Sequence, residues 1–159
     1  MKEAQALNGV ADFHRAFHVP VLDHPTIPDP DRCSLRINLL QEELDELKEA
    51  IAANDIVAVA DALCDIQYVL SGAILEFGLG DKFADLFAEV QRSNMSKICE
   101  TREVAEETVA YYQAERNTKG FITERNNQYL VYRVSDHKVL KSVRYSPADL
   151  ESILVQQEV

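Results

Sequence analysis

The sequence predicts a mainly α protein, an antiparallel bundle of helices with a small β-hairpin near the C-terminus. Two long segments, residues 34–51 and 56–77, carry apolar residues at spacings of three and four, which is typical of amphipathic helices. The period changes to two within residues 128–145, which indicates strands. With 159 residues, 47% of them hydrophobic, the chain is long enough for one core. We expect a single domain over residues 1–159, with a helical core at about 34–116 and the hairpin and a short helix at about 128–154.

The N-terminal half contains three predicted helical segments. Val10, Phe13 and Phe17 recur at helical spacing and predict a short first helix. The proline-rich stretch 19–31 predicts a loop, after which Ser34 is the expected N-cap of a long helix. The next helix is expected from Ile56 to Phe77, ending at glycines as helices commonly do.

The C-terminal half is predicted to hold helices on both sides of the hairpin. Asp81 is the expected N-cap of a helix reaching about residue 97, and a polar helix follows at about 102–116. Residues 128–134 and 138–145 are the expected strands, joined by a turn at 135–137. Ser146 is the expected N-cap of a last short helix that ends near Leu154.

Charge and composition exclude several classes of function. The formal net charge of -11 disfavours binding to a nucleic-acid backbone, and a phosphate ligand would need a cation beside it. The longest apolar stretch contains Asp61, Asp65 and Gln67, so we expect no membrane-spanning helix. The N-terminus lacks a sustained apolar segment, and the three cysteines show no paired spacing. These features favour a cytoplasmic protein.

Four carboxylates stand out on the two long helices. Leu40, Leu44, Leu47 and Ile51 form one apolar stripe, and this stripe is expected to face the core. Glu43 and Glu46 flank the stripe, whereas Glu42 and Glu49 point away from it and are expected on a solvated face. Asp61 and Asp65 are one turn apart on a helix that is apolar on nearly all sides, and a buried carboxylate without a partner is costly.

These carboxylates predict a metal site. Between residues 35 and 77 the only cations are Arg36 and Lys48, which cannot neutralise four acids. Hard divalent ions such as Mg²⁺ or Mn²⁺ accept an oxygen-only shell of this kind. We therefore expect Glu43, Glu46, Asp61 and Asp65 to bind Mg²⁺, with Mn²⁺ as a possible substitute. Asn94 and Lys97 continue an apolar stripe on the following helix. A lysine at the end of such a stripe more often reaches solvent or caps the helix, but beside a metal site both residues are candidate contacts to a phosphate or a base.

The motifs that carry these residues resemble a known family. EELDE at 42–46, followed by DALCD at 61–65, resembles the EExxE and DE-x-x-D pair of the all-α NTP pyrophosphohydrolases, which include MazG, dimeric dUTPases and phosphoribosyl-ATP pyrophosphohydrolase. Similarity covers most of residues 35–97, and KVLKSVRYSPADL at 138–150 resembles the phosphoribosyl-ATP pyrophosphohydrolase-like branch. One departure is Ala62, which stands where MazG-type members have Glu.

The resemblance implies a Mg²⁺-dependent enzyme that cleaves a nucleotide between its α and β phosphates, releasing a monophosphate and pyrophosphate. Family ligands fall on Glu43, Glu46 and Asp65, and Asp61 is our hypothesis for the ligand missing at Ala62. Glu46, with Glu43 beside it, is the expected catalytic carboxylate that orients or deprotonates water. Asn94 and Lys97 are implied contacts to base or phosphate, followed by Arg36 and Lys141. Members of the superfamily assemble as dimers or tetramers, so a homo-oligomer is expected.

Other functions stay open at this point. A phosphoribosyl-ATP pyrophosphohydrolase is one alternative, although the hairpin and the long N-terminal segment favour a divergent member with another substrate. A catalytically silent helical module that binds metal or nucleotide is a second alternative, because Ala62 interrupts the family pattern. A purely structural oligomerisation domain is the third, and it requires Asp61 and Asp65 to be neutralised within the protein.

Overall fold

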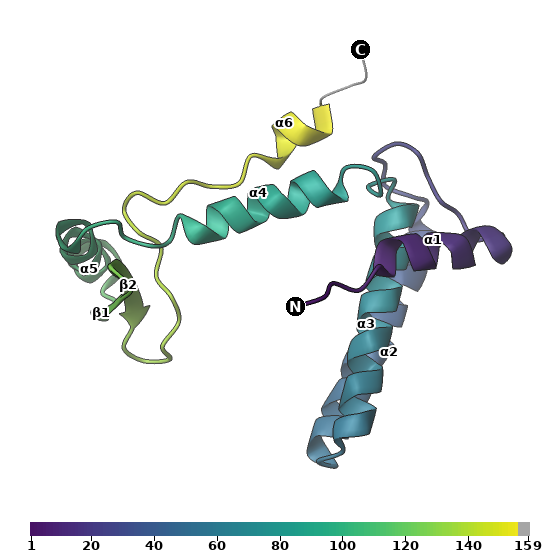
Figure 1. Ribbon diagram of the computed structural model, residues 1–159, viewed down its shortest axis with the longest axis horizontal. Coiled ribbons are helices and arrows are strands. Elements are labelled where there is room, and N and C mark those ends of the chain that lie inside the picture. Colours follow the sequence, from purple (N-terminus) through teal and green to yellow (C-terminus); the bar gives the residue numbers. More distant parts are fainter. Residues whose placement is uncertain (156–159) are drawn as a thin grey trace. The chain divides into compact units, whose positions relative to one another are not determined.

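The computed structural model describes residues 1–155, which form six helices and one two-stranded antiparallel sheet (Figure 1). The mainly helical class and the C-terminal hairpin are therefore confirmed. The chain divides into two compact units, Met1–Phe83 and a second that begins at Ala84. The single domain over 1–159 stays a prediction, and residues 156–159 lie outside the described range.

The first unit consists of α1 (Ala6–Ala16), α2 (Pro30–Ala52) and α3 (Ile56–Glu76). The two long helices form an antiparallel hairpin because only three residues connect them. In this connection, Asn54 has a φ of 54°, and the Asp55 carboxylate accepts hydrogen bonds from the backbone N–H groups of Val57 and Ala58. A small core of Val10, Ala11 and Leu75 joins α1 to the end of α3.

The start of α2 differs from the prediction. The helix begins four residues before Ser34, at Pro30, and its N-cap is Asp29, whose carboxylate accepts a hydrogen bond from the backbone N–H of Arg32. Proline at the first helical position and aspartate at the cap are a favoured combination, because proline lacks an N–H that the first turn leaves unpaired. The sequence did not predict this start, because the whole proline-rich stretch was assigned to a loop.

The predicted glycine end of α3 is confirmed at Gly78. This residue has a φ of +65°, and a Cβ at this position would lie 1.8 Å from the backbone oxygen of His24. No other residue type fits so close an approach of two backbones. Two backbone hydrogen bonds also hold the loop before α2 against the end of α3. They run from Leu22 N–H to the Leu75 oxygen and from Thr26 N–H to the Phe77 oxygen.

The second unit contains most of α4 (Phe83–Met95), then α5 (Arg102–Arg116), β1 (Gly120–Arg125), β2 (Gln128–Arg133) and α6 (Leu150–Val155). The position of α5 agrees with the prediction. Helix α5 packs against the hairpin around buried Cys99, Ala105, Val131 and Leu140. The N-cap of α6 is Asp149 and not Ser146, since the Asp149 carboxylate accepts from the backbone N–H of Ser152.

The predicted strand pairing is wrong. Residues 128–133 do form a strand, but its partner is β1, with Ile122 opposite Val131, and 138–145 contributes only an isolated bridge at Val139. Asn126 and Asn127 form the hairpin turn, and their φ angles of 51° and 59° are those of a two-residue primed turn. An Asn-Asn pair adopts such angles more readily than other non-glycine residues, a signal that the alternation in 138–145 obscured.

Candidate active site

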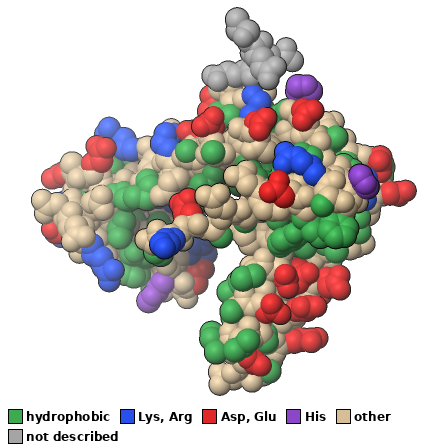
Figure 2. Space-filling view, turned by 45° about the vertical axis from the view of Figure 1, so that its right-hand side comes forward, with side chains coloured by type: hydrophobic (Ala, Val, Ile, Leu, Met, Phe, Trp, Pro, Cys, Tyr) green, Lys and Arg blue, Asp and Glu red, His purple; other side chains and the backbone are tan. Residues whose placement is uncertain are grey.

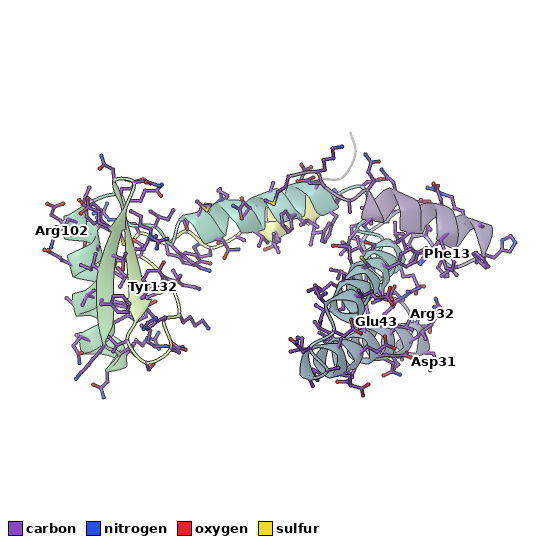
Figure 3. All side chains as sticks on the ribbon, turned by 60° about the horizontal axis from the view of Figure 1, so that its bottom comes forward. Phe13, Asp31, Arg32, Glu43, Arg102 and Tyr132 are labelled. Atoms are coloured by element: carbon purple, nitrogen blue, oxygen red, sulfur yellow. The ribbon has the colours of Figure 1, made fainter. Side chains whose placement is uncertain are left out.

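The α2–α3 hairpin brings the four predicted carboxylates to one region of the first unit. Glu43 and Glu46 lie on α2, and Asp61 and Asp65 lie on α3 (Figure 3 labels Glu43). Acidic side chains gather on this hairpin in Figure 2. Glu43 is partly buried, whereas Glu46, Asp61 and Asp65 are exposed. The expectation that both aspartates are buried is therefore wrong for the single chain, and the desolvation argument for a metal does not apply to them.

The pKa of Glu43 reflects repulsion by the carboxylates around it. Its pKa is raised above the ordinary value, first by partial desolvation and then by the negative charges of Glu46 and Asp65, followed by those of Glu42 and Asp61. The other three predicted ligands thus all act on Glu43. Across residues 1–155, none of the four has a hydrogen bond or ion pair with a protein cation.

The chemistry of these four side chains fits a hard divalent cation, since they offer carboxylate oxygens that no described protein cation neutralises. Within the described part of the chain, however, no three Asp, Glu, His or Cys side chains lie close enough together to hold a metal ion. Ala62, at the departure from the family pattern, is buried at 3% exposure. The metal ligands therefore stay a prediction.

Arg36 is not a free surface cation. Its side chain is buried, with 7% of the residue exposed, and it donates a hydrogen bond to the carboxylate of Glu76, which is 1% exposed. Arg32 donates to the same carboxylate through Nε, at 3.1 Å, and through Nη2. Two guanidinium groups thus share one carboxylate, and the group carries a net positive charge. The Nε of Arg36 has no hydrogen-bond partner among the described residues.

Close packing around Arg36 fixes its position. A Cβ at Gly72 on α3 would lie 2.7 Å from Arg36 Nη1 and 3.0 Å from His14 Nε2, so both groups lie against this glycine. His14 Nδ1 is 2.9 Å from the backbone oxygen of Pro20 and must donate, because a carbonyl only accepts. Burial alone would raise the pKa of Glu76, but hydrogen bonds from Arg36 and Arg32 and their charges hold it below the ordinary value.

A pocket of about 290 Å³ opens beside these groups. We call it the Arg36 pocket. Its polar lining comes from His14, Arg32 and Arg36, and its apolar lining from Phe13, Val19, Leu35, Leu39, Tyr68 and Val69. Figure 3 shows Phe13 on α1 and Arg32 on α2, two of the three helices that supply this lining. Phe13 and Tyr68 meet edge to face with their ring centroids 5.7 Å apart. The pocket lies entirely within the first unit.

The other predicted substrate contacts lie in the second unit and gather around Tyr145. Lys97 Nζ donates to Asn94 Oδ1 at 2.7 Å, and Lys141 Nζ lies 4.2 Å from the centre of the Tyr145 ring. The pKa of Tyr145 is lowered, first by the hydrogen bond from Ser93 and then by the charges of Lys141 and Lys97. The structure thus brings Asn94, Lys97 and Lys141 together. It does not place this group relative to the carboxylates, which belong to the first unit.

Sequence reasoning missed Glu76, Arg32 and His14. One signal was present: Glu76 is an acid at the end of an otherwise apolar helix, and Arg32 and Arg36 are four residues apart near the start of its antiparallel neighbour. In such a hairpin the start of one helix meets the end of the other, so an acid there faces the arginines. His14 offered no comparable signal, because its burial depends on how α1 crosses the hairpin.

Comparison with known proteins identifies the family of the region that carries the carboxylates. Residues 10–94, more than half of the chain, match the family model of phosphoribosyl-ATP pyrophosphohydrolase. The matched region contains α2 and α3 and therefore all four carboxylates, whereas the hairpin of the second unit lies beyond it. The uncharacterized protein L479 of Acanthamoeba polyphaga mimivirus is 21% identical, over 96% of this chain and 97% of that protein.

Proposed function

Because the chain belongs to the phosphoribosyl-ATP pyrophosphohydrolase family, in the all-α NTP pyrophosphohydrolase superfamily, we propose that it is a nucleotide pyrophosphohydrolase. In this proposal, water attacks the α phosphorus of a nucleoside triphosphate, the bond to the bridging oxygen breaks, and the products are a nucleoside monophosphate and pyrophosphate. The observation that carries it is the cluster of Glu43, Glu46, Asp61 and Asp65 on one helical hairpin within the matched region.

Glu43, Glu46, Asp61 and Asp65 are the residues we propose to hold Mg²⁺, or Mn²⁺ in its place. Three of them are exposed, so their side chains are free to turn toward a common ligand. When bound, the metal ion would neutralise phosphate oxygens and stabilise charge on the departing pyrophosphate. The pKa of Glu43 is raised first by partial desolvation and then by the charges of Glu46 and Asp65, and this supports the assignment because a bound cation would offset both effects.

Glu46 is the carboxylate that we propose as the general base. It is exposed, has no protein cation beside it in the described structure, and lies one turn from Glu43. An unpaired carboxylate keeps an oxygen available to accept a hydrogen bond from water and to take up its proton during attack. Asn94, Lys97, Arg36 and Lys141 stay the proposed contacts to the base or the phosphates.

A homo-oligomer, either a dimer or a tetramer, is part of the proposal. Ile37, Leu44, Ile51, Ile56, Val57 and Leu63 are all more than 40% exposed on α2 and α3, and we call them the apolar hairpin surface. Leu44 and Ile51 belong to the stripe that was expected to face the core. So much exposed apolar area on one element is typical of an interface. A second copy that covers it would also bring its own carboxylates near the site.

The same surface raises the question of a membrane. By length and composition α3 could span a bilayer, but a single such helix is weak evidence because soluble core helices meet the same criteria. Its antiparallel partner α2 carries Glu42, Glu43, Asp45, Glu46, Lys48 and Glu49, and that many charges are costly in a bilayer. We therefore propose a protein partner for α3, and a cytoplasmic location.

Phosphoribosyl-ATP is the second candidate substrate, because it is the substrate in the name of the matched family. The experiment measures the release of pyrophosphate and orthophosphate from a panel of nucleoside triphosphates and from phosphoribosyl-ATP. It tests both the reaction class and the choice between the two candidate substrates. Pyrophosphate release that needs Mg²⁺, and that Asp65→Asn abolishes while Glu49→Gln retains it, supports the proposal. Release of no pyrophosphate from any member of the panel contradicts it and favours the catalytically silent module.

A further inference from the structure

We propose that a pocket beside α5 binds a nucleoside monophosphate without a metal ion and holds its phosphate through Arg116 and Lys141. The pocket has a volume of about 490 Å³ and lies within the second unit, and we call it the α5 pocket. Its lining also includes Tyr111, Tyr112, Tyr145 and Glu107. The choice of a nucleotide rests on the proposed function, because a nucleoside monophosphate is a product of that reaction. The inference goes further in assigning a site and a new contact, Arg116.

Two hydrogen bonds fix the walls of the α5 pocket. The backbone N–H of Lys141 donates to the Tyr112 hydroxyl oxygen at 3.2 Å, and the backbone N–H of Val143 donates to Thr108 Oγ1 at 3.1 Å. Both acceptors belong to α5, and Thr108 is fully buried. The segment that carries Lys141 and Tyr145 is therefore held along the helix, and both sides of the pocket are fixed before a ligand binds.

The two cations of the lining have no anion beside them in the described structure. Arg116 and Lys141 are both exposed, and neither has a carboxylate within ion-pair distance among residues 1–155. Lys141 Nζ lies over the Tyr145 ring, a contact that leaves its positive charge without a counter-ion. Glu115 precedes Arg116, but successive residues of a helix do not face each other. An accessible guanidinium and an ammonium group at one pocket favour a phosphate as their ligand.

Aromatic side chains give the pocket a surface for the base. Tyr111 is 42% exposed, and its ring meets that of Tyr112 edge to face, with the ring centroids 5.4 Å apart. Bases of every kind stack on such a ring, so we expect the site to accept purines and pyrimidines. The volume lies within the range of about 300–1,000 Å³ that is typical of small-molecule pockets. Rings and cations together favour an aromatic phosphate over a simple anion.

Glu107 gives the pocket a direction. It is the one acid among the described residues of the lining, and it precedes Arg116 by nine residues, about 13–14 Å along the helix axis. Its carboxylate accepts hydrogen bonds from hydroxyl or amino groups, which a nucleoside carries away from its phosphate. The order of charges along α5 therefore matches the order of groups in a nucleoside monophosphate.

The α5 pocket differs from the carboxylate cluster in how it offsets the charge of a phosphate. The four carboxylates carry only negative charge and need a metal ion to hold a polyanion. The α5 pocket supplies positive charge from the protein itself, so removing divalent metal ions should leave its binding intact.

Calorimetry with the full chain in EDTA, using AMP, GMP, CMP and UMP, tests the site. We expect binding, with the corresponding nucleosides and inorganic phosphate at least tenfold weaker. Arg116→Gln and Lys141→Gln should each weaken the monophosphates at least tenfold. Arg125→Gln, an exposed arginine of the same unit outside the lining, is the matched control and should change nothing. Absence of binding by all four, or an affinity that Arg116→Gln leaves unchanged, overturns the proposal.

Two further readouts separate binding from a structural role. The affinity should fall as the salt concentration rises, because exposed charges hold the phosphate, and it should fall less in Arg116→Gln. Tyr111→Leu should weaken the monophosphates at least fivefold, whereas Phe121→Leu, 38% exposed and outside the lining, should not. An affinity that salt leaves unchanged overturns the role of the two cations.

Asp65→Asn keeps the failure of this proposal distinct from the failure of the proposed function. The variant should lose pyrophosphate release and keep its affinity for monophosphates in EDTA. Monophosphate binding that Asp65→Asn removes and Arg116→Gln retains would lie at the carboxylates and overturns the α5 pocket. Pyrophosphate release without monophosphate binding in EDTA rejects the pocket alone. Binding that depends on Arg116, without pyrophosphate release from any nucleotide, supports the pocket and rejects the proposed reaction.

Discussion

Arg36, in the second turn of α2, and Glu76, the last residue of α3, form a buried ion pair that closes the open end of the helical hairpin. Arg32 adds a second guanidinium to the same carboxylate. A buried carboxylate is stable only while such partners are present. This small network therefore holds together the two helices that carry the proposed catalytic residues.

Replacing Glu76 by Gln is expected to destabilise the protein strongly. The change leaves two guanidinium groups, one of them buried, without their anion, and breaking a buried pair in this way costs about 3–5 kcal/mol. Urea unfolding followed by circular dichroism measures the loss. Glu49→Gln, an exposed acid on α2, is the control and should stay within about 0.5 kcal/mol of wild type. A loss at Glu76 no larger than that would contradict the network.

Gly72→Ala is expected to destabilise the protein, although alanine in a helix interior is ordinarily favoured over glycine by about 1 kcal/mol. The added methyl group would lie 2.7 Å from Arg36 Nη1, and Arg36 cannot move away freely because Glu76 holds it. Overpacking of this kind costs about 1–3 kcal/mol. A rise in the free energy of unfolding would show that the Arg36 side chain is mobile in this position.

The contact between α4 and the start of α6 should depend on pH. Glu89 accepts hydrogen bonds from Arg92 and from the backbone N–H of Asp149, and these lower its pKa to about 2. A lowered carboxyl pKa contributes stability that is complete above the ordinary value of 4.5 and is lost as the pH falls toward 2. Hydrogen exchange at the Asp149 amide should therefore accelerate, beyond its intrinsic pH dependence, only below pH 4.5. Glu89→Gln should show no such transition.

Removing one of the clustered carboxylates should slightly stabilise the metal-free protein. Glu43→Gln relieves repulsion by Glu46 and Asp65, for which about 0.2–0.5 kcal/mol per like-charge pair is typical, so the melting temperature should rise by about 1–4 °C. The same variant should lose the stabilisation that added Mg²⁺ gives the wild type. Equal stabilisation of both proteins by Mg²⁺ would exclude Glu43 as a ligand.

An exposed apolar surface predicts self-association. Leu63→Glu places a charge on the apolar hairpin surface and is expected to reduce the mass measured by light scattering to that of one chain. Ile27→Glu is the control, because Ile27 is 81% exposed on the loop before α2 and does not belong to the apolar hairpin surface. A wild-type protein that is already monomeric at high concentration would contradict the proposed oligomer.

Local pattern predicted much of the helical hairpin, because the spacing of apolar residues and the Asn54–Asp55 break are properties of the sequence itself. The N-cap of α2 was mispredicted by five residues, at Ser34 in place of Asp29, since Pro30 was assigned to a loop when it stands at the first helical position. The strand pairing failed because alternation in 138–145 does not reveal which neighbour a strand chooses. An Asn-Asn turn decided that choice in favour of β1.

The acidic residues of the candidate site could be selected from the sequence, but their surroundings could not. Projection on a helical wheel separated Glu43 from Glu42, and the structure confirms that Glu43 is the more buried of the two. The same reasoning predicted burial of Asp61 and Asp65, which are exposed, because a wheel cannot show whether an apolar helix is covered. The Arg36 pocket depends on the crossing of α1 over the hairpin and left no local pattern in the sequence.

The most direct test of the account is to identify which anhydride bond is broken, by ³¹P NMR of a nucleoside triphosphate incubated with the protein and Mg²⁺ in ¹⁸O-labelled water. The account predicts nucleoside monophosphate and pyrophosphate, with the label carried by the monophosphate, and no reaction with Asp65→Asn. Nucleoside diphosphate and orthophosphate as products, or a reaction that Asp65→Asn leaves unchanged, would contradict it.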